Sequence, residues 1–161
     1  MITVYHGSAL EVSKPLVALG RPNLDFGQGF YVTDLREQAE RWATRIATRR
    51  MAKPVLSFYE FDLETAKQYR YLKFDFYDKA WLDFIVANRK GKMEWKDYDV
   101  IEGGVANDNV IDTVEDYEKG IITAEQALGQ LRYKHVNHQL CILSQQIIDK
   151  CLHYMGKESL Q

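Results

Sequence analysis

Two short motifs near the amino terminus place polar and aromatic side chains beside glycines, which is how small-ligand sites are commonly built. The motifs are YHGS at residues 5–8 and DFGQGFYVT at residues 25–33. His6 supplies an imidazole that can donate and accept hydrogen bonds, and Tyr31 supplies a flat phenol that can stack on a planar ligand. Glycine adopts backbone conformations closed to other residues and lets a ligand approach the main chain. We expect these properties to matter at Gly7, Gly27 and Gly29.

The remaining reactive residues form no recognisable catalytic or metal-binding pattern. His135 and His138 are three residues apart, but no carboxylate or third ligand lies near them in the sequence, so no metal site is expected. Ser8 lacks the glycine context of a nucleophilic serine on a tight turn. Cys141 and Cys151 have neither metal-site nor redox-motif spacing, and we expect them to be buried, reduced thiols.

Two strands and a helix must position the motifs. β-Rich runs predict strands at residues 2–5 and 29–32, joined by an irregular segment that carries prolines and glycines. Apolar residues then recur at helical spacing, which predicts a helix over residues 34–50. Asp34 and Glu37 have the spacing of a capping box at its start. The apolar face of this helix consists of Leu35, Ala39, Trp42, Ala43 and Ile46.

The opposite side of the same helix is basic. Arg41, Arg45 and Arg49 follow one another at four-residue spacing, and Arg50 and Lys53 come directly after them. Such a face is either simply solvated or a contact surface for an acidic partner or a nucleic acid. The sequence leaves both interpretations open.

The rest of the chain alternates short strands with helices. Strands are expected at residues 55–61, ending at Asp62, at residues 98–101, and at residues 138–143 as the last strand. Helices are expected through Phe76, Ala80, Trp81, Phe84 and Ile85, over residues 107–117, and over residues 124–131 behind a Thr123–Gln126 capping box. A terminal helix capped by Ser144 carries Ile147, Ile148, Cys151 and Leu152 as its apolar stripe. Gly103 and Gly104 either form a plain turn or cradle a phosphate.

Length and composition indicate one globular domain over residues 1–161. The chain has 161 residues, of which 46% are hydrophobic and 27% charged, and three prolines, which excludes extended disorder. The mixed order of strands and helices predicts an α+β fold. A net charge of −2 gives no global attraction to nucleic acid or to anionic membranes. The sequence has neither a secretory signal nor a membrane-spanning apolar run, so we expect a soluble, cytoplasmic protein without a membrane partner.

The two motifs together resemble the first two signatures of the ADP-ribosyltransferase superfamily. With Pro15, Gln38, Ala39, Trp42 and Ala43, the pattern is similar to a bacterial family of short ADP-ribosyltransferase-like domains. The likeness covers residues 4–43 and resumes at residues 97–108 and 138–152. It implies a split β-sheet core with flanking helices, which binds NAD as a substrate and needs no metal.

The resemblance also implies roles for individual residues. His6 matches the first-strand histidine that hydrogen-bonds the adenosine-side ribose, and Tyr31 matches the second-strand tyrosine that stacks on nicotinamide. Gly7 would let the dinucleotide pass close to the strand. The implied NAD-binding residues are His6, Gly7, Ser8, Asp25, Gly29, Phe30, Tyr31 and Thr33, and the implied catalytic residues are His6, Tyr31 and Gln139.

The third catalytic position departs from the superfamily pattern. Most active transferases have a glutamate there, whereas the matching strand reads NHQLCIL and places Gln139 at that position. A glutamine can accept a hydrogen bond from a ribose hydroxyl, but it cannot neutralise positive charge or take a proton near neutral pH. Loss of one such stabilising group costs about 3 to 4 kcal/mol in comparable sites. An intrinsically nucleophilic acceptor, or a carboxylate such as Asp25 or Asp99, could compensate.

Three functions follow from the resemblance as hypotheses. The first is a mono-ADP-ribosyltransferase that modifies an unknown macromolecular acceptor, protein or nucleic acid, as a bacterial or phage toxin with a possible cognate antitoxin or immunity partner. The second is an NAD glycohydrolase, with water as the acceptor. The third is a non-catalytic module that binds NAD or a related nucleotide as a sensor or partner domain, and the glutamine at position 139 favours it.

Overall fold

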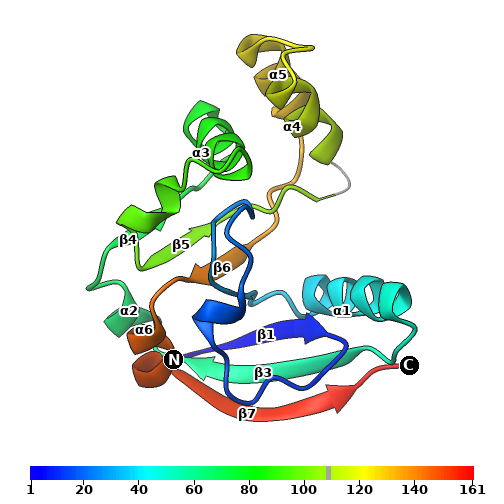
Figure 1. Cartoon of the computed structure of the whole chain (residues 1–161), viewed down its shortest axis with the longest axis vertical. Coiled ribbons are helices and arrows are strands. Elements are labelled where there is room, and N and C mark those ends of the chain that lie inside the picture. The colour runs from blue at the N-terminus through cyan, green and yellow to red at the C-terminus, as the bar shows by residue number, and fades with distance from the viewer. Residues whose placement is uncertain (108–109) are drawn as a thin grey trace.

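Two β-sheets and the helices around them form the protein, in a computed structural model that describes residues 1–107 and 110–161. One sheet has three strands in the order β1-β3-β7, and the other has four in the order β2-β6-β5-β4 (Figure 1). Strands and helices are mixed along the chain. The α+β class expected from the sequence is therefore confirmed, and the strands are divided between two sheets.

The three-stranded sheet is antiparallel throughout. It consists of β1 (Ile2–Ser8), β3 (Val55–Phe61) and β7 (Leu152–Ser159). The first strand runs three residues beyond its expected end, so that His6, Gly7 and Ser8 are part of it. β3 has the bounds that its β-rich sequence predicts.

β7 was not expected from the sequence. The terminal helix, α6 (Gln145–Cys151), ends just before Leu152, and the chain continues as a strand that pairs with β3. The expectation that residues 138–143 form the last strand is therefore wrong. Leu152, assigned to the apolar stripe of that helix, is the first residue of β7. Ser144 is the amino-terminal cap residue of this helix, as expected, but its side chain makes no capping hydrogen bond.

The four-stranded sheet contains β2 (Phe30–Val32), β4 (Tyr71–Lys73), β5 (Val100–Gly103) and β6 (Gln139–Ile142). β4 and β5 are parallel, and the other neighbouring pairs are antiparallel. β5 and β6 are buried at every position. Gly103 lies inside β5 rather than ending a strand at Ile101, which corrects the expected strand at residues 98–101.

The two sheets meet at Tyr5 and Thr33. These residues exchange two backbone hydrogen bonds, Tyr5 N to Thr33 O at 2.8 Å and Thr33 N to Tyr5 O at 3.0 Å. The bridge connects β1 of one sheet with the end of β2 of the other. Both sequence motifs therefore converge at the junction between the sheets.

Helix α1 (Arg36–Arg50) packs on β1 through Ala39, Ala43 and Ala47, which are buried (Figure 1). It begins two residues after the expected start, and Leu35 at its amino-terminal cap makes no side-chain hydrogen bond. The expected capping box is therefore wrong, because the Asp34 carboxylate hydrogen-bonds His138 instead. Trp42, expected on the apolar face, is 47% exposed.

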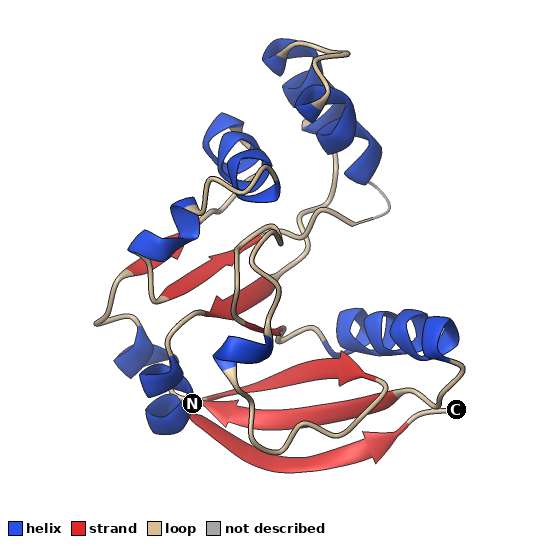
Figure 2. Cartoon of the chain, viewed as in Figure 1, coloured by secondary structure: helices blue, strands red, loops and turns tan. Residues whose placement is uncertain are grey.

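The remaining helices are α2 (Leu63–Ala66), α3 (Lys79–Arg89), α4 (Ile111–Glu118), α5 (Ala124–Leu131) and α6, with short 3-10 turns at Val17–Leu19 and Glu94–Asp97 (Figure 2). The Thr123–Gln126 capping box of α5 is confirmed. Phe76 precedes α3 and is 69% exposed, so it does not belong to that helix. The helix expected from Asn107 begins at Ile111, and residues 108–109 of the expected range lie outside the described residues.

Two hydrophobic cores divide the molecule into layers. The first contains Val4, Val32, Tyr59, Phe61, Leu140 and Ile142, and so lies between the two sheets. The second contains Ile101 and Cys141 from the four-stranded sheet together with side chains of α3, α4 and α5, such as Trp81, Val114 and Leu131. Cys141 and Cys151 are free and buried, as expected. Within the described ranges, no helix has the length and apolar character needed to cross a membrane.

Candidate functional site

His6 is fixed against the backbone of the second motif. Its Nδ1 lies 2.7 Å from the carbonyl oxygen of Tyr31, and its ring stacks on Phe30 with centroids 4.4 Å apart. Burial lowers the pKa of His6, and the hydrogen bond to the carbonyl opposes this shift only in part. Because a carbonyl can only accept, Nδ1 carries the proton and the neutral ring keeps a lone pair on Nε2. Nε2 is therefore the atom that can accept a hydrogen bond from a ligand hydroxyl.

Tyr31 is hydrogen-bonded to the loop that precedes its own strand. Its hydroxyl donates to the carbonyl oxygen of Gly27 at 2.7 Å and accepts from the Phe26 amide at 3.3 Å. Burial is the main reason why the pKa of Tyr31 lies well above its usual value, so the phenol stays protonated. The ring packs against the second core. In this arrangement the hydroxyl holds residues 26–31 in shape, and only the ring is available for stacking.

Packing accounts for the motif glycines. A Cβ at Gly7 would lie 2.1 Å from the Ala39 carbonyl oxygen, so the glycine lets α1 approach β1. Gly27 has φ +94°, and a Cβ there would meet the Trp95 ring at 2.1 Å. A Cβ at Gly29 would lie 2.6 Å from the Cys141 sulfur. Of the three, only Gly27 has a positive φ, which corrects the expectation that all three adopt conformations closed to other residues.

Gln139 is the first residue of β6 and is only 8% exposed. Within residues 1–107 and 110–161, its side-chain amide has no hydrogen-bond partner, although its backbone is paired opposite Gly103. Its amide atoms are not among the fully buried, unpartnered side-chain atoms of this part of the chain, so they keep some contact with solvent. The Gln139 amide can therefore form hydrogen bonds to a ligand that reaches the start of β6.

The strand register brings the predicted residues onto neighbouring strands. Tyr31 is opposite Cys141, and Val32 is opposite Leu140, so Thr33 comes level with Gln139. Since side chains alternate along a strand, Tyr31 and Gln139 leave the same face of the four-stranded sheet, the face of the second core. His6 stacks on Phe30 and so lies on the other face, at the Tyr31 backbone. The structure thus places all three residues at one junction. His6 lies on one face of β2, and Tyr31 and Gln139 lie on the other face.

The other residues implied as NAD-binding are placed around this junction. Ser8 ends β1, and Phe30 is buried in the first core. Thr33 is buried, and its hydroxyl donates to the His138 carbonyl oxygen at 2.8 Å and accepts from the Leu35 amide at 3.1 Å. Their role in binding NAD stays a prediction.

The two carboxylates considered as compensation for the missing glutamate are held elsewhere. Asp25 pairs with Arg89 at 2.6 Å, and the Asn88 amide bonds its backbone carbonyl. Asp99 pairs with Arg70 at 3.0 Å, which holds the pKa of Asp99 below its usual value. Neither carboxylate makes a contact with Gln139 among the described residues.

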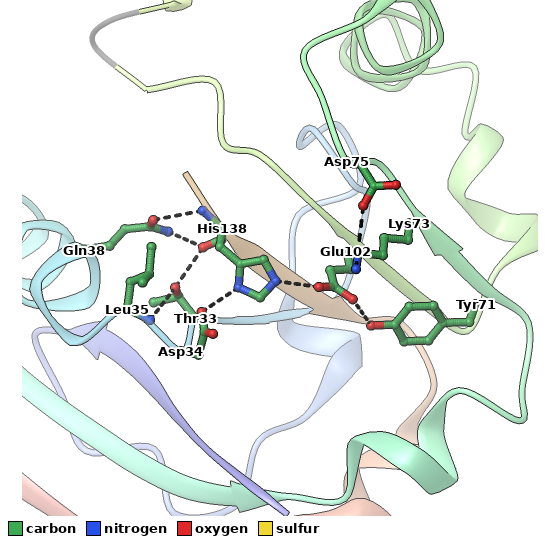
Figure 3. A network of polar contacts seen from close by, with 9 residues as sticks. All are labelled: Thr33, Asp34, Leu35, Gln38, Tyr71, Lys73, Asp75, Glu102 and His138. Carbon is green, nitrogen blue, oxygen red and sulfur yellow. Dashed lines mark hydrogen bonds and ion pairs between the residues drawn. The ribbon is translucent and has the colours of Figure 1, made fainter. Parts of the chain in front are cut away.

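A different carboxylate network surrounds His138, the residue before Gln139 (Figure 3). His138 Nδ1 lies 2.6 Å from Asp34 Oδ1, and His138 Nε2 lies 2.7 Å from Glu102 Oε2. Glu102 is 8% exposed and also accepts a hydrogen bond from the Tyr71 hydroxyl. Gln38 bonds both backbone groups of His138, with its Nε2 2.6 Å from the carbonyl oxygen. The start of β6 is thereby tied to β4, β5 and α1.

In this network, the hydrogen bonds and charges of His138, Glu102 and Asp34 shift the pKa values of His138 and Glu102. Burial alone would lower the pKa of His138, but the hydrogen bonds and the negative charges of Glu102 and Asp34 raise it overall. Burial likewise acts to raise the pKa of Glu102, and its bonds to His138 and Tyr71 lower it overall. Each ring nitrogen faces a carboxylate oxygen, so the geometry favours the imidazolium form, in which both nitrogens donate. In that form His138 is a positioning group rather than a base.

The sequence analysis did not identify the network. Asp34 was assigned to a helix cap, Glu102 was not singled out, and His138 was considered only as a metal ligand paired with His135. One signal was present: Glu102 is an acidic residue within an apolar strand, VIEG, and buried glutamates are almost always paired. The identity of its partner depends on strand pairing across the fold.

Two surface hollows among the described residues are lined by residues other than His6, Tyr31 and Gln139. The larger, of about 870 Å³, lies along the outer face of α1 and is lined by arginine, threonine and glutamate side chains. The smaller, of about 270 Å³, includes Tyr5, Arg36 and Phe58.

Comparison with known proteins gives one match. A family model described as "Protein of unknown function (DUF3990)" matches residues 2–154. The matched region includes both motifs, α1, the Glu102 strand and β6, and it ends within β7. Neither the curated proteins nor the solved structures gave a match.

Proposed function

The chain belongs to this DUF3990 family of unknown function, and from its site we propose that it is an NAD-dependent mono-ADP-ribosyltransferase. The observation that carries the proposal is Gln139, whose side-chain amide makes no hydrogen bond to the described residues and leaves the same sheet face as the Tyr31 ring. The resemblance of the two motifs to the ADP-ribosyltransferase superfamily supports it. His6 at the same junction, with Nε2 free of its backbone bond, supports it as well.

In the proposed reaction the bond between the ribose C1′ and the nicotinamide nitrogen breaks. Nicotinamide leaves with the bonding electron pair, and positive charge develops on the ribose ring. The acceptor then forms a bond to C1′ and releases a proton to solvent. The Tyr31 ring would stack on nicotinamide, and the His6 Nε2 would accept a hydrogen bond from the adenosine-side ribose. Because the two side chains lie on opposite faces of β2, NAD would have to pass around this edge strand to contact both.

Gln139 would orient the ribose of the nicotinamide half through its amide. It can bond the ribose hydroxyls in both directions, because its oxygen accepts and its nitrogen donates. It brings no charge to stabilise the oxocarbenium-like state. The acceptor must therefore be nucleophilic in itself, such as a thiol or a nucleobase nitrogen, or turnover must be slow.

The test is incubation of the pure protein with adenylate-labelled NAD and cell lysate, with label resolved on protein, RNA, DNA and free ADP-ribose. We expect label on one class of macromolecule, and Gln139→Ala to lower its rate by about 10²- to 10³-fold. Gln68→Ala is the matched control, because Gln68 is an exposed glutamine far along the chain from the junction. Free ADP-ribose without any labelled macromolecule would instead identify an NAD glycohydrolase.

A second candidate, a non-catalytic NAD-binding module, is favoured by the lack of a carboxylate at position 139. It predicts thermal stabilisation by NAD without release of nicotinamide, and a gain of turnover in Gln139→Glu. NAD at a hundred times its dissociation constant should add about 2.7 kcal/mol to the free energy of unfolding. No label and no stabilisation by NAD would refute both candidates.

A further inference from the structure

The pairing between β2 and β6 ends just before His138. β2 pairs with β6 only as far as Val32, which lies opposite Leu140. The next residue of the chain, Thr33, directs its backbone N–H and C=O to Tyr5 of the other sheet, at 3.0 and 2.8 Å. Because these groups are used between the sheets, the ladder of β2 and β6 stops before it reaches His138.

The side chain of Gln38 pairs with His138 where the strand partner ends (Figure 3). Its Nε2 donates to the His138 carbonyl oxygen at 2.6 Å, and its Oε1 accepts from the His138 amide at 3.3 Å. In an antiparallel ladder, a residue of the neighbouring strand bonds the same two groups with its own N–H and C=O. A primary amide carries one acceptor and two donors. Gln38 therefore acts as the side-chain equivalent of one hydrogen-bonded residue of β2.

Gln38 makes this contact from the first turn of α1. It is the third residue of the helix, the position from which a glutamine in a capping box bonds back to the cap residue. Here the Thr33 hydroxyl accepts from the amide of the cap residue, Leu35, at 3.1 Å. The helix is seated closely on β1, since a Cβ at Gly7 would collide with its backbone. Gln38 therefore extends from a helix whose place on the sheet is fixed by packing.

His138 is held through its side chain as well as its backbone, whereas the side chain of the next residue is not. Asp34 and Glu102 lie 2.6 and 2.7 Å from the two His138 ring nitrogens. The Gln139 side-chain amide makes no hydrogen bond to the residues that the structure describes. The place of this amide therefore depends on the backbone at residues 138–139 and on packing.

We propose that Gln38 is a positioning residue for Gln139, an inference that rests on the proposed transferase function. Gln38 fixes the backbone of His138 and thereby the place of the next side chain, whose amide orients the ribose in the proposed reaction. A misplacement of about 1 Å at such a site can cost about 10²-fold in rate. Gln38 itself contacts neither NAD nor the acceptor in this scheme. Its loss should therefore lower the rate of transfer more than the binding of NAD.

The first test compares label transfer from adenylate-labelled NAD to a fixed amount of cell lysate in Gln38→Met and Gln126→Ala. Gln38→Met keeps the side-chain length and a high helix propensity but removes both hydrogen bonds to His138. We expect kcat to fall by about 10²-fold, with the KM for NAD nearly unchanged. Gln126 is the matched control, because its amide bonds a backbone group, the Thr123 amide, at 2.8 Å in the capping box of α5. Gln126→Ala should leave kcat unchanged, and an equal fall in both variants would overturn the proposal.

A double-mutant cycle then shows whether Gln38 acts through Gln139. Residues that act through one another have non-additive effects, whereas independent residues have additive ones. We expect Gln38→Met to cause no further loss of rate in the Gln139→Ala background. The same fold-loss in both backgrounds would show a general structural role and contradict the proposal.

A measurement without NAD separates this proposal from the transferase itself. The side-chain amide resonances of Gln139 in a ¹⁵N–¹H spectrum are identified by their absence in Gln139→Ala. They should shift in Gln38→Met and keep their positions in Gln126→Ala. Unshifted resonances in Gln38→Met would overturn the positioning role whether or not the protein transfers ADP-ribose. Absence of label with the wild-type protein would refute the transferase proposal instead, and the resonances would still show whether Gln38 controls the Gln139 amide.

Discussion

His138 is held between two carboxylates, and this makes the start of β6 sensitive to pH. Its pKa is raised in the folded protein, so its stabilising effect is full below its unfolded pKa of about 6.5. The effect is lost as the pH rises through the folded pKa. His6 acts in the opposite direction, because burial lowers its pKa and folding then opposes its protonation.

We therefore predict that His138→Gln destabilises the protein most at low pH. Loss of two charge-assisted hydrogen bonds should cost about 2 kcal/mol at pH 5.5 to 6. The difference from wild type should shrink as the pH rises, because wild-type His138 loses its own proton. Urea unfolding of both proteins at several pH values between 5.5 and 9 gives this difference, from which the contribution of His6 cancels. A difference that grows with pH would contradict an imidazolium in the folded state.

The position of a residue at the sheet junction could be predicted only where a local motif carried it, and the roles of these residues in a site stay predictions. His6 and Tyr31 stand in glycine-containing motifs, and the structure places both at one junction. The His138 network could not be predicted, because Asp34, Glu102 and His138 are far apart in sequence. Strand pairing brings Glu102 and His138 together, and pairing depends on the whole sheet.

Gly7 determines how closely α1 packs on β1. A methyl group at this position would lie 2.1 Å from the Ala39 carbonyl oxygen and 2.8 Å from the Ala43 amide nitrogen. These are backbone atoms of a helix, which cannot move aside like the end of a flexible side chain. The glycine is therefore a requirement of packing between two elements.

Gly7→Ala should lower the free energy of unfolding by about 1 to 3 kcal/mol, the usual cost of overpacking. Gly129→Ala is the control, because Gly129 lies in α5 and a Cβ there has nothing within 4 Å. Since alanine favours helix over glycine, that change should stabilise the protein by about 0.5 to 1 kcal/mol. Denaturant unfolding measures both, and equal effects of the same sign would show that α1 can shift away from β1 at little cost.

Elements with strong local signals were predicted well. β3 has its expected bounds, and α5 begins behind the expected capping box. Asp34 failed as a cap because tertiary contact with His138 gives its carboxylate a charged partner. β7 was missed because LHYMGKES is mostly exposed and contains Gly156, so its pattern lacks a clear apolar face. Pairing with β3, rather than its own sequence, makes it a strand.

Among the described residues, the polar contacts at the junction include the Tyr5–Thr33 bridge and the His6–Tyr31 hydrogen bond between the two sheets. The Gln38–His138 contacts join α1 to the start of β6. The first core supports them from one side, between the sheets. The α+β class could be predicted from the order of the elements, but this arrangement depends on register between strands distant in sequence.

The junction should therefore be the part of the molecule that responds to NAD. Some amides exchange with solvent only when the protein opens and releases its ligand. With NAD at a hundred times its dissociation constant, these amides should exchange up to about 100-fold more slowly. The amides of Tyr5 and Thr33, which form the bridge, should lead this response. Amides of α5 that exchange through local fraying should not change, because that helix contacts the second core away from the bridge. Hydrogen exchange followed by mass spectrometry, on wild type and on Gln139→Ala, measures the effect. Protection that persists in Gln139→Ala, or that is confined to α1, would place NAD away from the sheet junction.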